Sequence, residues 1–338
     1  STGEVAASAH GEMACAECHT GYDRFPHPSR ASTASCESCH EEAHSAWQES
    51  VHAGQENLRI VRCAACHTIH RVLPADTLRT PAGAAVMNAS CVSCHEAARL
   101  PEGTAHAGKS GCAQCHGSHA IHAVADTRSA VAPARQYATC GACHDTIAAT
   151  ARQDAHGAAV MRWSHPDTVQ LLTPDVVPPP ACTGCHDAHR MRPAGTAEFE
   201  AAMVERCSAC HEDYAETYLG TYHGKATALG SVIAATCADC HTAHRIHPAS
   251  DPRSSVAAAN LVATCGTCHE HARPAFVQYD SHPTLDYDRN PWIFFSFWFM
   301  NGLLLFVVVV FGAHTALWWV RLMLDRRKER GHVTGGHA

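Results

Sequence analysis

The chain has 338 residues, of which 25 are Lys or Arg, 32 are Asp or Glu, 29 are His and 20 are Cys. Positions 1–290 hold 20 basic and 30 acidic side chains, an excess that disfavours nucleic acid and favours partners with a basic docking face. Such a cysteine content is typical of exported proteins with a disulfide framework or of proteins with several zinc sites. The spacing of the cysteines therefore has to show which kind of site they form.

All 20 cysteines fall in ten Cys-x-x-Cys-His motifs. Neither disulfides nor zinc sites require a histidine after every second cysteine, whereas covalent attachment of c-type haem does. In that chemistry the two thiols bond to the haem vinyl groups and the histidine coordinates the iron. The predicted attachment residues are Cys15, Cys18, Cys36, Cys39, Cys63, Cys66, Cys91, Cys94, Cys112, Cys115, Cys140, Cys143, Cys182, Cys185, Cys207, Cys210, Cys237, Cys240, Cys265 and Cys268. The predicted iron ligands of the motifs are His19, His40, His67, His95, His116, His144, His186, His211, His241 and His269.

The motifs alternate between two types along the chain. First-type motifs precede an acidic or helix-forming run and begin at Cys36, Cys91, Cys140, Cys207 and Cys265. Second-type motifs carry another histidine three positions after the motif histidine and begin at Cys63, Cys112, Cys182 and Cys237; the motif at Cys15 occupies a second-type place without that histidine. We expect five two-haem modules that stack into an elongated, mainly α-helical and irregular domain over 1–290. The porphyrins would supply most of its buried apolar surface.

A second axial histidine would make each iron six-coordinate. After each first-type motif, the spacing places a further histidine 11 to 13 residues beyond the motif histidine, commonly beside a glycine, and the stretch 41–54 between them reads as two or three helical turns. This set, with one histidine ahead of the first motif, is His10, His52, His106, His156, His223 and His282. The second-type motifs add His70, His119, His189 and His244. Which of these histidines serves which haem stays open, because ligands often cross between neighbouring motifs.

Six other histidines break the repeat and are weaker candidates: His27, His44, His122, His165, His247 and His271. His27 is an alternative for the histidine missing from the first module. Methionine is the other common axial ligand, but the methionines follow no repeat position, so bis-histidine coordination is expected.

The stretch 164–181 is an insertion into one module, and its proline run predicts an extended loop. It is either a docking surface or a tolerated surface insertion.

The composition changes abruptly after position 290. Residues 292–320 contain no charged side chain and would span about 43 Å as a helix, more than a bilayer core needs. Tryptophans lie near both ends, and a basic run follows. We expect a transmembrane helix over 291–322 and a basic cytoplasmic tail over 323–338, with the haem domain in the periplasm. The N-terminal residues lack the charged and apolar regions of a signal peptide, as expected of a processed form.

His314 lies within this apolar stretch, where an ionisable side chain is a functional hypothesis by default. It is a candidate ligand for a b-type haem shared with a partner subunit, or a neighbour of a bound quinone. The alternative is an interfacial histidine that hydrogen-bonds a neighbouring helix.

The repeated motifs and the single anchor resemble the multihaem c-type cytochromes of bacterial respiratory chains. The stretch "FGAHTALWWVRL" at 311–322 is similar to the helix that, in some of them, leads into a cytochrome b membrane domain. The resemblance implies an inner-membrane electron-transfer subunit, not itself an enzyme, between a cytochrome b-like or other quinone-reactive subunit and periplasmic electron carriers. Two alternatives remain: a reductase of a small nitrogen or sulfur oxyanion with one open haem site, and a structural subunit whose haems scaffold a larger complex.

Overall fold

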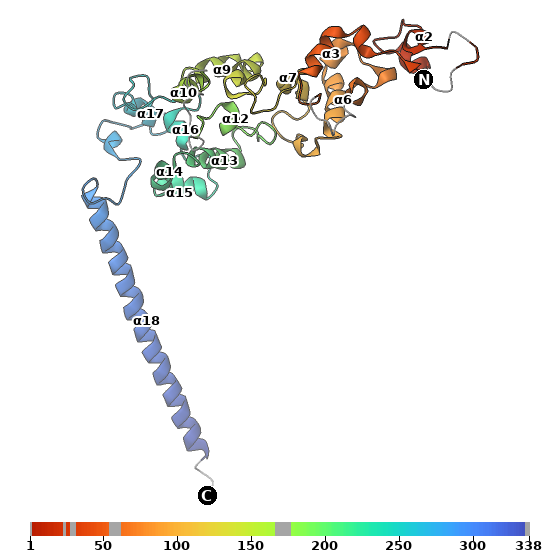
Figure 1. The fold of residues 1–338 in the computed structure, drawn as a ribbon. Coiled ribbons are helices and arrows are strands. Elements are labelled where there is room, and N and C mark those ends of the chain that lie inside the picture. Colours follow the sequence, from red (N-terminus) through yellow and green to blue (C-terminus); the bar gives the residue numbers. More distant parts are fainter. Residues whose placement is uncertain (1, 23–24, 28–31, 54–61, 166–176, 335–338) are drawn as a thin grey trace.

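A computed structural model describes the chain apart from residues 1, 23–24, 28–31, 54–61, 166–176 and 335–338. The described chain is mainly helical, as predicted, and short helices form an elongated head over residues 2–290 (Figure 1). The strands of the described part are β1 (His19–Thr20) and β2 (Ser32–Thr33), which pair antiparallel with His19 opposite Thr33. Most of the predicted loop at 164–181 lies outside the described residues.

The α-helices of the head are short. They are α1 (Thr2–Ala6), α2 (Cys15–Cys18), α3 (Glu41–Gln48), α4 (Cys63–Cys66), α5 (Ala75–Leu78), α6 (Pro81–Val92), α7 (Cys112–His116), α8 (Gln136–Thr139), α9 (Asp145–Ala151), α10 (Ala155–Trp163), α12 (Cys182–Cys185), α13 (Ala197–Ser208), α14 (Glu212–Leu219), α15 (Tyr222–Ala228), α16 (Cys237–His241) and α17 (Leu261–Gly266). The 3-10 helices are η1 (Cys36–Ser38), η3 (Ile69–Arg71), η4 (Glu96–Ala98), η5 (Pro133–Arg135), η6 (Cys140–Ala142) and η7 (Phe276–Gln278).

Each motif is folded as a single turn. In the motif at Cys36 the backbone N–H of His40 donates to the Cys36 carbonyl at 2.9 Å, and the motifs at Cys91, Cys140, Cys182, Cys207 and Cys265 repeat this bond at 2.9 to 3.0 Å. Residues three and four apart on a helical turn share one side. The local turn therefore presents both thiols and the imidazole of a motif in the same direction.

The helix expected after first-type motifs forms in three of the five cases, as α3, α9 and α14. After the motif at Cys91 only η4 follows, and after the motif at Cys265 no α-helix follows within the head. Both exceptions have a proline shortly after the motif, Pro101 and Pro274. Proline disfavours helical backbone at the preceding residue, so the helix cannot extend.

Packing explains why a glycine lies beside two of the predicted distal histidines. Asp154 caps α10 by accepting from Gly157 N at 2.8 Å, and Thr221 caps α15 by accepting from Gly224 N at 3.2 Å. A Cβ at Gly224 would overlap the Tyr218 carbonyl oxygen at the end of α14, and Gly157 is equally close to the end of α9. Only glycine lets these helices begin so near the preceding helix.

The side-chain core is small for a head of this length. The hydrophobic residues that are buried among the described ones are Ala132, Tyr137, Ala148, Val160, Ala181, Tyr218 and Ala257. The largest cluster joins Tyr137, Val160 and Ala181. Such a core is smaller than a chain of this length ordinarily needs.

Thr242 follows the motif histidine His241 with φ 64°, a conformation that disfavours side chains with a Cβ, and its hydroxyl is buried without a hydrogen-bond partner. Gly117 occupies the same place after His116 with φ 82°. Thr242→Gly is therefore expected to raise the free energy of unfolding by about 1–3 kcal/mol. Denaturant titration of the holoprotein checks this, and Gly117→Thr should lower the stability; equal midpoints for all three chains would contradict the assignment.

The helix α18 (Pro291–Thr334) extends away from the head (Figure 1). Its segment Pro291–Arg327 is long and apolar enough to cross a membrane, and the apolar window is not buried within the protein. The helix continues beyond the predicted limit at 322, into the stretch expected to be a separate tail. Residues 322–330 contain no proline or glycine, and they include good helix formers.

Candidate functional site: ten histidine pairs

The 20 predicted histidines meet in ten pairs, each joining one motif histidine to one histidine of the other predicted set. The ring centroids of a pair lie 5.8 to 6.4 Å apart. The pairs are His10–His40, His19–His70, His52–His95, His67–His119, His106–His144, His116–His189, His156–His211, His186–His244, His223–His269 and His241–His282.

This spacing suits a metal ion between two rings. A metal about 2.0 Å from one nitrogen of each ring, on opposite sides, places the two ring centroids about 6.3 Å apart. Among the described residues no group of three or more His, Cys, Asp or Glu side chains could hold a metal ion. Each pair thus offers two axial ligands, and an equatorial group would have to supply the rest, as a porphyrin does.

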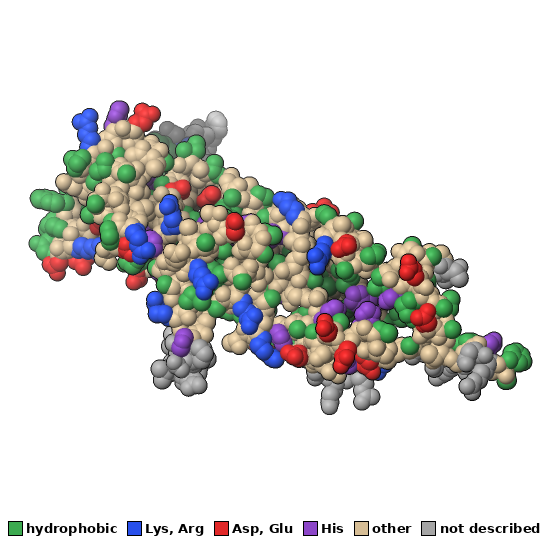
Figure 2. Space-filling model, turned by 90° about the horizontal axis from the view of Figure 1, so that it is seen from above, with side chains coloured by type: hydrophobic (Ala, Val, Ile, Leu, Met, Phe, Trp, Pro, Cys, Tyr) green, Lys and Arg blue, Asp and Glu red, His purple; other side chains and the backbone are tan. Residues whose placement is uncertain are grey.

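The surroundings of the pairs also fit such a group. None of the motif cysteines is buried, so their thiols are accessible for covalent attachment. Histidine side chains gather in a hollowed part of the face shown in Figure 2. Together with the small side-chain core, these features leave room for large apolar groups. The role of the paired histidines as iron ligands stays a prediction.

The pairs connect different modules. First-type motif histidines pair with a histidine that comes earlier in the chain, as His95 does with His52. Second-type motif histidines pair with one that comes later, as His67 does with His119. His52, which follows the motif at Cys36, therefore does not face that motif's histidine. The ligand sets of neighbouring modules interlock.

The motif cysteines lie near one another in sequence order. A hydrogen bond joins the first cysteine of a first-type motif to the first cysteine of the following second-type motif in four cases: Cys36–Cys63, Cys91–Cys112, Cys140–Cys182 and Cys207–Cys237. Four further proximities link each second-type motif to the next first-type motif: Cys66 to Cys94, Cys115 to Cys140, Cys185 to Cys207 and Cys240 to Cys265. The motifs from Cys36 to Cys265 thus form an unbroken series.

These contacts shift the acidity of the free thiols. The hydrogen bond from Cys91 lowers the pKa of Cys112 to about 6, and the one from Cys140 lowers the pKa of Cys182 to about 7. A lowered pKa increases the thiolate fraction, which is the nucleophilic form. The two hydrogen-bonded thiols of each of these pairs therefore differ in nucleophilicity.

The surroundings of four second-type motif histidines favour the neutral imidazole. Burial, followed by repulsion from the paired histidine, lowers the pKa of His67, His116, His186 and His241. A neutral imidazole keeps a nitrogen lone pair for a metal.

His282 has a fixed tautomer. Its Nδ1 lies 3.0 Å from Thr217 Oγ1 and 3.2 Å from the Tyr214 carbonyl oxygen, both on α14. The carbonyl can only accept, and the Thr217 hydroxyl donates to the same carbonyl at 2.9 Å, so Nδ1 carries the hydrogen. The other nitrogen is left with its lone pair, which suits a ligand opposite His241. No sequence pattern pointed to Thr217.

Thr217→Val is expected to raise the reduction potential of one haem, because an imidazole whose N–H loses an acceptor is a weaker donor to the metal. A spectroelectrochemical titration should show about one tenth of the absorbance change moved to higher potential. Thr150→Val is the matched control, since the Thr150 hydroxyl also donates to a carbonyl one helical turn earlier, that of Thr146 at 2.8 Å. A titration curve unchanged by Thr217→Val would contradict the assignment.

The weaker candidates have other neighbours. His27 lies against Tyr22 and Phe25, while His19 takes His70 as its partner. His44 contacts Glu37 at 3.0 Å. The structure gives His165 and His271 no place in the ten pairs, and His314 is exposed on α18.

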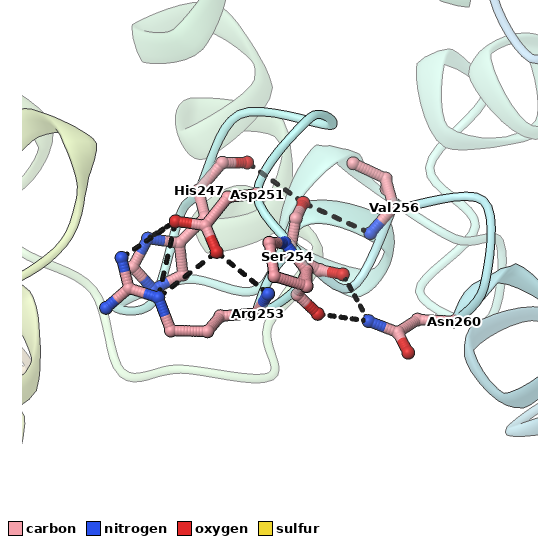
Figure 3. A network of polar contacts seen from close by, with 7 residues as sticks. His247, Asp251, Arg253, Ser254, Val256 and Asn260 are labelled. Atoms are coloured by element: carbon pink, nitrogen blue, oxygen red, sulfur yellow. Dashed lines mark hydrogen bonds and ion pairs between the residues drawn. The ribbon is translucent and has the colours of Figure 1, made fainter.

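His122 and His247 belong to a repeated connector between motifs. Figure 3 shows the second copy, in which Asp251 lies beside His247 at 3.9 Å and accepts from the Arg253 guanidinium at 2.7 Å. Hydrogen bonds from Arg253 lower the pKa of Asp251 to about 2. Ser254 donates to the His247 carbonyl at 2.9 Å, which closes the turn. These residues fix the path of the chain between motifs and do not form a metal site.

Comparisons with models of protein families, with curated proteins and with solved structures found no match to this chain. The interpretation of the site therefore depends on its own geometry.

Proposed function

We propose that residues 1–290 bind ten covalent haem c groups and carry electrons along them. The observation that carries this proposal is the set of ten histidine pairs, each containing one Cys-x-x-Cys-His histidine. Ten motifs and ten pairs match one to one, which a disulfide framework or zinc sites would not require.

Each part of the site has one task in this proposal. The two cysteines of a motif attach the group, and the paired histidines occupy the two axial positions. Bound haem supplies a one-electron couple whose potential depends on axial ligands, burial and nearby charge. Two histidine ligands leave no open position for a substrate, and this favours an electron carrier over an enzyme. The five two-haem modules of the sequence repeat belong to the same proposal.

The series of cysteine contacts supports a continuous path through the head. It runs from the motif at Cys36 to the motif at Cys265, which precedes α18 in the chain. We propose that α18 anchors the head to the inner membrane, with the head in the periplasm and the basic C-terminal end in the cytoplasm. A cytochrome b-like or other quinone-reactive subunit is the proposed membrane partner, at or near His314, and periplasmic electron carriers are the partners of the head.

Electron paramagnetic resonance of the oxidised protein, with a haem count and added nitrite or cyanide, tests this proposal. We expect about ten low-spin haems, with a spectrum that does not change when nitrite or cyanide is added. A high-spin haem that binds an additive would instead favour the reductase alternative. Fewer haems than motifs would contradict the one-to-one match.

A further inference from the structure

The loop that follows α15 exposes an unusual amount of apolar surface. Leu229 is 89% exposed and Ile233 is 91% exposed, with Val232 beside them at 54%. Tyr222, at the start of α15, is 82% exposed. A single exposed apolar residue is ordinary, but several on one short loop are typical of a contact surface. We call residues 229–233 the apolar loop.

The apolar loop itself contains no predicted haem residue, and the predicted attachment residue Cys237 follows Ile233 by four positions. The nearest predicted ligand in the chain is His223, the second residue of α15, whereas the loop begins after the other end of that helix. Six residues of helix separate His223 from Leu229 by about 9 Å along the helix axis.

Most backbone N–H groups of the apolar loop are hydrogen-bonded locally. The N–H groups of Gly230 and Ser231 donate to the carbonyls of Thr227 and Ala226 at 2.9 and 3.0 Å. The Ser231 hydroxyl accepts from the N–H groups of Ile233 and Ala234, both at 3.3 Å. An apolar surrounding offers no replacement for water, so a loop that enters one must bond its own donors. The loop meets it for the N–H groups of Leu229, Gly230, Ser231 and Ile233, whereas the N–H group of Val232 would need water or lipid headgroups at the boundary.

The apolar loop is tied to the membrane segment. On α14, the Tyr218 hydroxyl donates to the Ala235 carbonyl and accepts from the Thr227 hydroxyl of α15, both at 3.0 Å, so α14, α15 and the end of the loop form one unit. That unit holds His282 through Thr217 at 3.0 Å. Eight residues lie between His282 and Pro291, where α18 begins, and even a fully extended chain over these nine steps spans only about 30 Å.

The linker to α18 is not fully extended. Asn290 N donates to the Asp286 carbonyl at 2.8 Å, which forms a turn directly before the helix. In Figure 1, α14 and α15 lie at the edge of the head toward which α18 extends. The apolar loop directly follows α15, so it belongs to this edge of the head and lies within a short linker of α18.

We propose that the apolar loop inserts Leu229, Val232 and Ile233 into the boundary between headgroups and acyl chains of the membrane that α18 crosses. Tyr222 suits the headgroup level, and Lys225 of the same helix suits a lipid phosphate. With α18 this makes a second point of attachment, which fixes the tilt of the head on the membrane. The proposal rests on the proposed role of α18 as the membrane anchor.

Lipid photolabelling of the full-length holoprotein tests the proposal. The protein is reconstituted in nanodiscs of phosphatidylethanolamine and phosphatidylglycerol that contain a diazirine-bearing lipid, and labelled peptides are mapped by mass spectrometry. Labelling is expected in α18 and in the peptide that contains residues 226–236. The double variant Leu229→Ser, Ile233→Ser should lower the labelling of that peptide several-fold. Phe25, 90% exposed at the opposite end of the head, serves as the internal control and should stay unlabelled.

The outcomes separate the loop from the anchor. Labelling of α18 alone would overturn the proposed loop insertion and leave the anchor standing. If neither segment were labelled, both the proposed membrane anchor and the proposed loop insertion would be wrong. Labelling of the loop that disappears when a membrane subunit is co-reconstituted would identify a protein contact in place of lipid, and would also overturn the proposal.

Discussion

His223→Ala is expected to convert one haem in about ten from low-spin to high-spin, because the centroid of His223 lies 6.1 Å from that of His269 and no other histidine forms this pair in the described structure. The lost ligand opens one axial position. Cyanide should then bind with a stoichiometry of about one per chain, against about zero for the unaltered protein. Electron paramagnetic resonance and a cyanide titration measure the two effects. Added imidazole should restore the low-spin signal.

The same measurements on further variants distinguish whether His223 or His282 pairs with the histidine of the last motif. Spacing along the chain would allow His282 to serve the motif at Cys265, whereas the structure places it opposite His241. In a chain that lacks the last haem through Cys265→Ala and Cys268→Ala, His223→Ala should produce no high-spin haem, while His282→Ala should still produce one. The opposite result would show that the two ligands are exchanged. His271→Ala is the matched control and should change nothing.

Gly224→Ala is expected to destabilise the head by about 2–4 kcal/mol, because the added methyl group would overlap the Tyr218 carbonyl at the end of α14. Relief requires α15 to move, and His223 moves with it. The variant should therefore lower the thermal midpoint and weaken the ligation opposite His269 together. Calorimetry and the high-spin signal measure the two effects on one sample.

Gly3→Ala is the matched control, since a Cβ at Gly3 in α1 meets nothing within 4 Å. Alanine is the better helix former by about 1 kcal/mol, so this variant should be neutral or slightly more stable. If Gly224→Ala behaved like the control, the close approach of α15 to α14 would be wrong.

Local patterns were sufficient to predict several features. A Cys-x-x-Cys-His motif spans one helical turn, so the common direction of its three side chains follows from spacing alone. The apolar composition after position 290 predicts a long helix because apolar length is a local property, and α18 bears this out. The repeat predicted the candidate distal histidines. If every module needs a second iron ligand, a histidine should recur at a similar spacing in every module.

Partner choice depends on contacts between distant segments. Nothing near His40 in the chain says that His10, and not His52, faces it, because the assignment follows from how neighbouring modules stack. The same holds for Thr217, whose hydroxyl orients His282 across 65 residues of sequence. No residue spacing encodes a hydrogen bond between a helix and a loop so far apart.

By itself, then, the sequence determined the motifs, the candidate ligands and the apolar C-terminal helix, because each is set by residues within one or two helical turns. Only the tertiary structure decided the pairing of the histidines, the serial order of the neighbouring cysteines and the exposure of the apolar loop. These features depend on packing between segments that the chain brings together only when it folds.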